Sequence, residues 1–311
     1  MHPQRKAILL MHLATFLFGF TAILGKAISL SSINLVWHRM WLASAIFLLF
    51  PGFIKAFKQT SVQTKKRFLL IGCLVALHWL TFYGCIKLSN SASLALACFG
   101  TIAFFAALLE PLIIKTPFKK VELFLGIIII IGLAFIAKSN PDEHFSWQSS
   151  YIQAMAMGVV SAFFAALFSV FNKKYVADNN PMVITFLQML GGFAFLTLLL
   201  PFYIAYFGVD FQILPQTNDI IYLILLAVLC TNIAFSLEME ALKNMSAFMS
   251  NLIINLEPIY GMILAIFFFH ENEMLNIWFY SGTFLIIATV FLHPLLERKT
   301  LLFKNKKHRQ H

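Results

Sequence analysis

The stretch AILLMHLATFLFGFTAILG, residues 7–25, decides the class of this protein. It holds 19 consecutive residues without an Asp, Glu, Lys or Arg, and Lys6 and Lys26 border it. A helix needs about 20 mainly apolar residues to cross the ~30 Å hydrocarbon core of a bilayer. Extended to residues 7–29, the stretch therefore predicts a transmembrane helix.

Nine further apolar runs follow the first one. Hydrophobic residues make up 60% of the 311 residues and charged residues only 12%, with a mean hydropathy of +0.83. A soluble domain carries about twice this charged fraction. We therefore predict an all-α integral membrane protein with ten transmembrane helices, since backbone groups in lipid must be paired within their own segment. The ten predicted spans are residues 7–29, 33–54, 67–87, 91–114, 121–138, 151–172, 182–206, 218–240, 245–269 and 274–295.

The basic residues predict the orientation. If the N-terminus is cytoplasmic, the inner connections and both chain ends hold 19 of the 23 Lys and Arg residues, and the outer connections hold only Lys87 and Lys138. The positive-inside rule then places both termini in the cytoplasm, as expected of a multi-pass protein of the cell (inner) membrane. The net charge of +10 thus lies in loops that flank a lipid bilayer. It does not gather on a folded face with interleaved aromatics, so nucleic acid is not an expected partner.

The two halves of the chain resemble each other weakly. At a shift of 156 residues Lys87 meets Lys243 and Gly126 meets Gly282, and at a shift of 148 Lys26 meets Lys174. Five spans are an odd number, so two five-helix copies would cross the membrane in opposite senses, as in many secondary transporters. We predict a first repeat at residues 1–139, a second, inverted repeat at 148–296, and a basic cytoplasmic tail at 297–311.

The sequence resembles the EamA-type branch of the drug/metabolite transporter superfamily over residues 7 to about 295. The similarity rests on Phe18-Gly19 followed by Lys26, on Arg39 early in the second span, and on four later features: Ala-Leu-Lys-Asn-Met-Ser-Ala (241–247), Asn-Leu-Glu-Pro (255–258), Glu271 and Gly282. The resemblance implies ten helices and export or uptake of amino acids, nucleobases, cofactors or drugs, often by proton-coupled exchange. It also implies a solute site near the midplane, lined by spans 1, 3, 4, 6, 8 and 9.

Glu257 is the main candidate for chemistry. It lies about 12 residues from either end of the ninth run, near the bilayer centre, where an ionisable side chain is costly and is usually functional or paired. Pro258 beside it can kink the helix and free a carbonyl group. The structural alternative is that Glu257 accepts hydrogen bonds that lock neighbouring helices together.

Other polar and aromatic residues within the spans are candidates for substrate binding. Asn251 and Asn255 are spaced i,i+4 on one helical face, which Glu257 cannot share on a straight helix. Each candidate also has a packing alternative: the asparagines could bridge helices, Trp79 and Tyr83 could pack rather than form a platform, and the stripe that begins at His12 could serve close helix approach. The predicted substrate-binding residues are Glu257, Asn255, Asn251, Tyr83, Trp79, His12 and Asn232.

Lys26 and Arg39 would lie near the outer ends of the first two spans. Their long side chains could extend to the lipid headgroups, or they could form a cationic vestibule for a carboxylate. Glu238 and Glu240 would lie at the cytoplasmic interface of the eighth span.

The sequence contains no motif for a cofactor, an ATP motor or a metal. The approximate match at Gly19–Lys26 has Ala27 where a P-loop requires Ser or Thr, and His270-Glu271 lacks the second His of a zinc helix. We therefore predict a secondary transporter, not an enzyme, that exports or exchanges a small organic metabolite, with protons as candidate coupling ions, acting as a monomer or homodimer. The alternatives are a membrane-embedded enzyme acting on lipid and a non-transporting sensor or scaffold.

Overall fold

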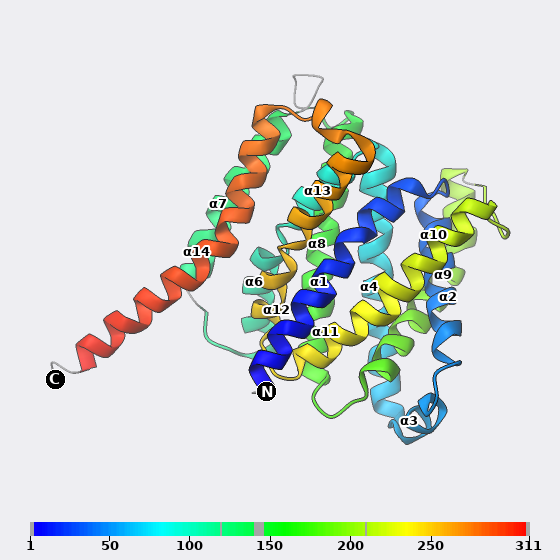
Figure 1. The fold of residues 1–311 in the computed structure, drawn as a ribbon, viewed down its shortest axis with the longest axis horizontal. Coiled ribbons are helices and arrows are strands. Elements are labelled where there is room, and N and C mark those ends of the chain that lie inside the picture. Colours follow the sequence, from blue (N-terminus) through cyan, green and yellow to red (C-terminus); the bar gives the residue numbers. More distant parts are fainter. Residues whose placement is uncertain (1–2, 119, 140–145, 209, 309–311) are drawn as a thin grey trace.

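A computed structural model describes residues 3–118, 120–139, 146–208 and 210–308 (Figure 1). Within these ranges the chain is all helical and no strand occurs. The helices are α1 Pro3–Ala27, α2 Ser32–Phe47, α3 Phe53–Gln59, α4 Val62–Ser89, α5 Ala92–Phe99, α6 Ile102–Ile114, α7 Lys120–Lys138, α8 Ser150–Tyr175, α9 Pro181–Phe207, α10 Thr217–Ala227, the π-helix η1 Val228–Ile233, α11 Ala234–Leu242, α12 Ala247–Ile254, α13 Glu257–Phe269, the 3-10 helix η2 Glu271–Glu273, and α14 Ile277–His308.

In the described part of the chain, seven helical segments are long and apolar enough to cross a membrane, and two shorter apolar helices accompany them. The class of integral membrane protein is therefore confirmed, whereas the number of ten crossings stays a prediction. The second predicted span, 33–54, is too long. Its helix α2 ends at Phe47, because a turn at Leu48–Gly52 follows, with Gly52 at φ +79°.

Two of the long segments are broken halfway at corresponding places. In the first half, α5 and α6 are separated at Gly100-Thr101; in the second half, α12 and α13 are separated at Asn255-Leu256. A break within a crossing leaves backbone groups unpaired, which membrane proteins tolerate where those groups line a cavity or are buried in protein.

The broken segments also begin and end alike. The side chain of Ser91 caps α5 by accepting from the Leu94 amide, and Ser246 caps α12 by accepting from the Met249 amide. At the other end, Lys115 and His270 both adopt a left-handed conformation, with φ of 64° and 52°. The same start, break and end thus recur in both halves.

Helices of the two halves pack closely against each other. From the first half, α4 packs on α8 and α9 of the second half, and α1 packs on α11 and α13. Helix α7 runs beside the longer helix α14 at one edge of the bundle (Figure 1). Glycines permit the closest approaches. A Cβ atom at Gly72 of α4 would lie 2.2 Å from the backbone oxygen of Gln188 in α9. The core therefore lies where the two halves meet.

Candidate functional site

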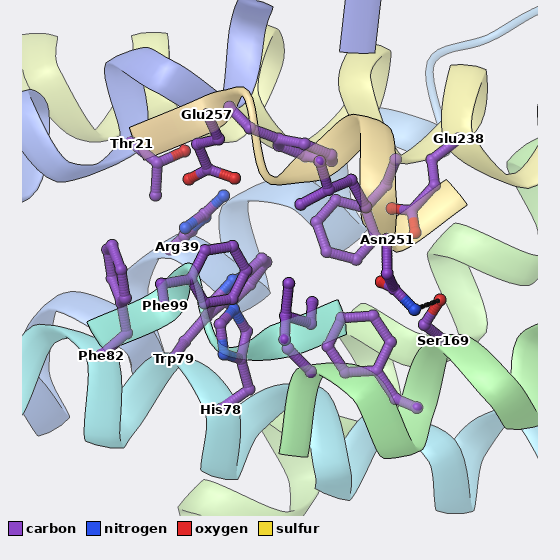
Figure 2. Close-up of a pocket in the computed structure, with 16 residues that line it drawn as sticks. Thr21, Arg39, His78, Trp79, Phe82, Phe99, Ser169, Glu238, Asn251 and Glu257 are labelled. Atoms are coloured by element: carbon purple, nitrogen blue, oxygen red, sulfur yellow. Dashed lines mark hydrogen bonds between the residues drawn. The ribbon is translucent and has the colours of Figure 1, made fainter. Parts of the chain in front are cut away.

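A narrow cavity of about 30 Å³ lies at the centre of this contact between halves (Figure 2). All six predicted lining spans contribute to it, and α2 contributes Arg39 in addition. Its walls are mainly aromatic and aliphatic, with a few polar groups, as in most small-molecule sites. The lining residues are Phe18, Thr21, Arg39, His78, Trp79, Phe82, Phe99, Ile102, Ala165, Phe168, Ser169, Phe235, Glu238, Asn251, Ile254 and Glu257.

Arg39 is fully buried in the protein, with 0% of its surface exposed. Its Nη1 donates to the Tyr83 hydroxyl at 2.7 Å and its Nε donates to Thr231 Oγ1 at 2.8 Å. The guanidinium also covers the face of the Trp79 ring, 3.5 Å from the ring centroid. Extension of Arg39 to the lipid headgroups is therefore wrong. The residue lies at the middle of α2, where neighbouring helices supply enough hydrogen-bond acceptors and aromatic surface to hold its charge inside.

The π-helix η1 provides the third hydrogen-bond acceptor of Arg39. A π-turn interrupts the regular i→i−4 ladder, and in η1 the carbonyl oxygen of Cys230 accepts from Arg39 Nη2 at 3.0 Å. The Thr231 hydroxyl, which accepts from Arg39, itself donates to Leu226 O at 2.9 Å. A local irregularity of the backbone thus serves to hold one buried cation.

Glu257 lies at the start of α13 and lines the cavity. The carboxylate points toward the guanidinium of Arg39 in Figure 2. A carboxylate in the first turn of a helix interacts favourably with the free amides and the positive end of the helix dipole. The break before α13 therefore places an acid beside a fixed cation in the interior.

The same break determines which of the two predicted asparagines lines the cavity together with Glu257. Asn251 lines the cavity together with Glu257, and its Nδ2 donates to Ser169 Oγ at 3.1 Å (Figure 2). Asn255 is 1% exposed but does not line the cavity, and neither polar atom of its amide has a hydrogen-bond partner in the described structure. A straight helix would have put Asn251 and Asn255 on one face. Because the helix breaks at Asn255, Asn251 and Glu257 both line the cavity instead.

The other predicted lining residues fall into two groups. Trp79 forms part of the wall, with Tyr83 behind it as a partner of Arg39. Asn232 and His12 do not line the cavity. Asn232 Nδ2 donates to Ala43 O at 3.2 Å, and His12 is half-buried on a different face of α1 from the lining residue Phe18.

Lys26 is not part of a vestibule with Arg39, because it forms an ion pair with Glu271 at 2.7 Å. Glu271 also accepts from the backbone amides of Ala92 and Ser93, each at 2.8 Å, and from the Ser91 hydroxyl at 3.2 Å. We call Lys26, Glu271 and the α5 N-terminus at residues 91–93 the Glu271 latch. Burial by itself raises the pKa of the Glu271 carboxyl. The hydrogen bonds from Lys26, Ser93 and Ala92 outweigh that effect, so the pKa is lowered.

Glu238 is a cavity residue that the sequence analysis missed. It is 2% exposed and lines the cavity, so its placement at the cytoplasmic interface is wrong, whereas Glu240 is half-exposed and pairs with Lys243 at 2.9 Å. The reason is that α11 packs along α1 down to Leu242, which buries one face of the helix beyond the predicted end of the span. The i,i+3 spacing of Phe235 and Glu238 would have been the signal for a shared inward face.

The model of the EamA-like transporter family matches residues 5–138 and, a second time, residues 152–293. The chain belongs to this family.

This EamA-like chain is therefore a multi-pass membrane protein of a transporter family with two copies of one repeat. It is 24% identical over 264 residues to an uncharacterized transporter, YxxF, of Bacillus subtilis (strain 168). The aligned region covers 83% of this chain and 80% of that relative. A protein of known crystal structure superposes with a TM-score of 0.67 at 13% identity, over 95% of this chain and 99% of the other. That likeness shows the same fold.

The described residues of this EamA-like protein contain no group of three or more His, Cys, Asp or Glu side chains that could hold a metal ion.

Proposed function

We propose that this EamA-like protein is a secondary transporter that exports or exchanges a small organic metabolite across the cell membrane. The solute would bind in the central cavity, and access would alternate between the two faces as the halves move relative to each other. The observation that carries the proposal is the buried set of Arg39, Glu238 and Glu257 around one cavity at the contact between halves. Buried charges in a membrane interior are costly and mark solute or ion pathways.

The directions of the helices support an inverted relation between the two copies. The C-terminal end of α1 carries Lys26, which pairs with Glu271 just before Asn276. Asn276 Nδ2 in turn donates to Ser139 O, and Ser139 Oγ is 2.6 Å from the hydroxyl of Tyr151 at the start of α8. The first helix of one copy thus ends where the first helix of the other begins. Such antiparallel copies give two related conformations that open toward opposite sides.

Contacts at that same end of the bundle support a closed face. The Glu271 latch joins α1, α5 and η2. In addition, Asp219 of α10 accepts from the Ser29 amide at 2.8 Å and from the Ser29 hydroxyl at 2.6 Å, and Lys87 donates to the carbonyl of Ile28. If these connections face outward, as the basic residues predict, the structure is closed to the outside. Release of a solute to the outside then requires these contacts to separate.

We assign Glu257 the role of a protonation or recognition residue. Its carboxylate faces the cavity and lies beside Arg39. A proton or a solute that enters the cavity would replace Arg39 as the partner of this carboxylate. The test begins with a thermal-shift screen of the purified protein against amino acids, nucleobases, cofactors and organic amines, since a ligand of the folded state raises the melting temperature. The strongest stabiliser is then used in radiolabelled form for uptake into proteoliposomes, with and without a pH gradient.

The informative variant is Glu257→Gln, and Glu273→Gln is its matched control because Glu273 is exposed on the η2 turn. We expect Glu257→Gln to lose most of the pH-gradient dependence of uptake while Glu273→Gln keeps it. Unchanged flux and pH dependence in Glu257→Gln would remove the role of Glu257. A stabilising compound that the wild-type protein binds but does not move would contradict transport.

A further inference from the structure

Glu238 differs from the other acids of the interior in its surroundings. It is 2% exposed, it lines the cavity, and its Oε1 has no hydrogen-bond partner in the described structure. Figure 2 shows it at the opposite end of the cavity from Arg39 and Glu257, next to Asn251. An acceptor held without a partner in a membrane interior is costly. It is accordingly expected to meet a donor that enters the cavity.

The charges that line the cavity are not balanced. Arg39 and Glu257 lie together, and their opposite charges offset each other. The remaining ionisable residues of the wall are His78 and Glu238, and His78 Nδ1 is already engaged by the carbonyl oxygen and the hydroxyl of Ser161, at 3.1 and 2.8 Å. None of the ion pairs found between described residues includes Glu238. The end of the cavity near Glu238 therefore has an acid without a fixed cation.

The wall around Glu238 is aromatic. Phe235, one turn earlier on α11, contacts Phe18 with ring centroids 5.3 Å apart, Trp79 at 5.5 Å and Phe168 at 6.1 Å. Aromatic faces attract cations through the ring quadrupole. The same faces do not attract a ligand that carries a carboxylate or phosphate group. The Oδ1 atom of Asn251, which has no hydrogen-bond partner in the described structure, adds a second acceptor near Glu238.

We propose that the solute of this cavity is an organic amine in its protonated form, with an apolar or aromatic body. Its ammonium group would donate to Glu238 and Asn251 Oδ1, and its body would lie against Phe235 and Phe168. This assignment rests on the proposed transport function, since it names the class of solute that the same cavity takes. Anionic solutes are disfavoured at this end, because they would face Glu238 without a free cation to receive them.

The test is binding to the full-length protein in detergent, measured by calorimetry and by thermal shift. The probes are phenethylamine and hexylamine, together with 2-phenylethanol, hexanol, 3-phenylpropionate and hexanoate, which keep the body and change the charge. We expect the amines to bind at least about tenfold more tightly than the alcohols and carboxylates. We also expect Glu238→Gln to weaken amine binding by at least about tenfold, while the control variant Glu240→Gln, at a half-exposed residue outside the cavity, binds as the wild type does.

Several results would overturn the assignment. These are amines that fail to bind the wild type, neutral or anionic analogues that bind as tightly, or a folded Glu238→Gln protein that binds amines normally. If Glu238→Gln does not fold, Glu238→Asp and Phe235→Leu replace it. The shorter acid should retain part of the amine selectivity, whereas loss of the central ring should weaken the amines more than the alcohols.

Vesicle experiments separate this inference from the transport proposal. Amines that bind in detergent with the expected Glu238 dependence, but are not moved across proteoliposomes, would leave the ligand class standing and contradict transport. Flux of a neutral or anionic solute that is unaffected by Glu238→Gln would leave transport standing and contradict the amine assignment.

Discussion

Arg39 and Trp79, on α2 and α4 of the same half, are stacked with the guanidinium carbon 3.5 Å from the centroid of the indole. Around this pair the guanidinium donates to Tyr83, Thr231 and the Cys230 carbonyl. The last two partners belong to the second half, so Arg39 joins the two halves while its charge faces the cavity. A planar group with several donors suits this position better than a point charge does.

Replacement of Arg39 by Lys should therefore be severe. A Lys ammonium keeps the charge but cannot span the three acceptors while it stacks on Trp79. Hydrogen bonds to charged groups contribute about 1.5–3 kcal/mol each. We therefore expect Arg39→Lys to lower the free energy of unfolding by the contribution of more than one such bond, and to weaken solute binding more than tenfold. Thermal unfolding in detergent and ligand titration measure the two effects.

Tyr83→Phe is the graded companion of that variant. It removes one acceptor of Arg39 and leaves Thr231, the Cys230 carbonyl and the Trp79 face in place. We expect a loss of about 1–3 kcal/mol with the cavity otherwise preserved. An Arg39→Lys protein as stable as Tyr83→Phe would show that the other contacts of the guanidinium contribute little.

The Glu271 latch predicts a stability that depends on pH. The pKa of the Glu271 carboxyl is lowered in the folded protein, so the folded state favours the ionised form. Its contribution is complete above the unfolded pKa, near 4.5, and is lost as pH falls through the lower folded value. The melting temperature of the wild type should accordingly exceed that of Glu271→Gln at pH 7, and the gap should narrow as the pH falls below about 4.5.

Glu273→Gln is the control for the latch, because Glu273 is exposed on the same turn. Its melting temperature should follow that of the wild type at every pH. A constant gap between wild type and Glu271→Gln across the acidic range would show that the carboxylate charge of Glu271 does not stabilise the fold.

Two glycines of α4, one that faces α9 and one that faces α8, predict a contrast between two Ala substitutions. At Gly72 a new Cβ would lie 2.2 Å from the Gln188 carbonyl oxygen, which is backbone, so a helix must move. At Gly84 the new Cβ would lie 2.1 Å from Met157 Cε, the end of a flexible side chain. We expect Gly72→Ala to destabilise the protein by about 1–3 kcal/mol and Gly84→Ala to be nearly neutral. Equal melting temperatures for the two variants would contradict this reading.

The sequence predicted the membrane class and the presence of two repeats, because the length of apolar runs and the order of matching residues can be read along the chain. It indicated a kink beside Pro258 in the ninth span but not the break in the first half. Pro258 follows the break in the second half, but the break at Gly100-Thr101 has no proline near it. That break depends on how α5 and α6 pack against other helices.

The candidate site was predicted in part. The inward positions of Glu257, Asn251 and Trp79 followed from their depth in apolar runs. Position along a run gives depth but not the direction of a side chain relative to neighbouring helices. For that reason the fully buried Arg39 and the inward Glu238 were misplaced. The predicted stripe on α1 consists of His12, Thr15, Gly19, Ala22 and Lys26. At Gly19 it lies in close helix contact, since a Cβ there would lie 2.9 Å from Tyr260 Cβ.

The charge distribution of the loops predicts which side of the membrane each end of the bundle faces. The Lys-rich α3 and the basic C-terminal tail should lie inside, whereas the η2 turn, which has acids and no Lys or Arg, should lie outside.

Single cysteines introduced by Lys58→Cys, Thr300→Cys and Asn272→Cys test this with a membrane-impermeant maleimide on intact cells. Three of the four native cysteines, Cys85, Cys98 and Cys230, are buried, and Cys73, which is partly exposed, is replaced by Ser as background. We expect labelling from outside only at position 272, and labelling at 58 and 300 only after the cells are opened. Positions 58 and 300 on opposite sides of the membrane would require an odd number of crossings between them, and two antiparallel copies of five spans would then be excluded.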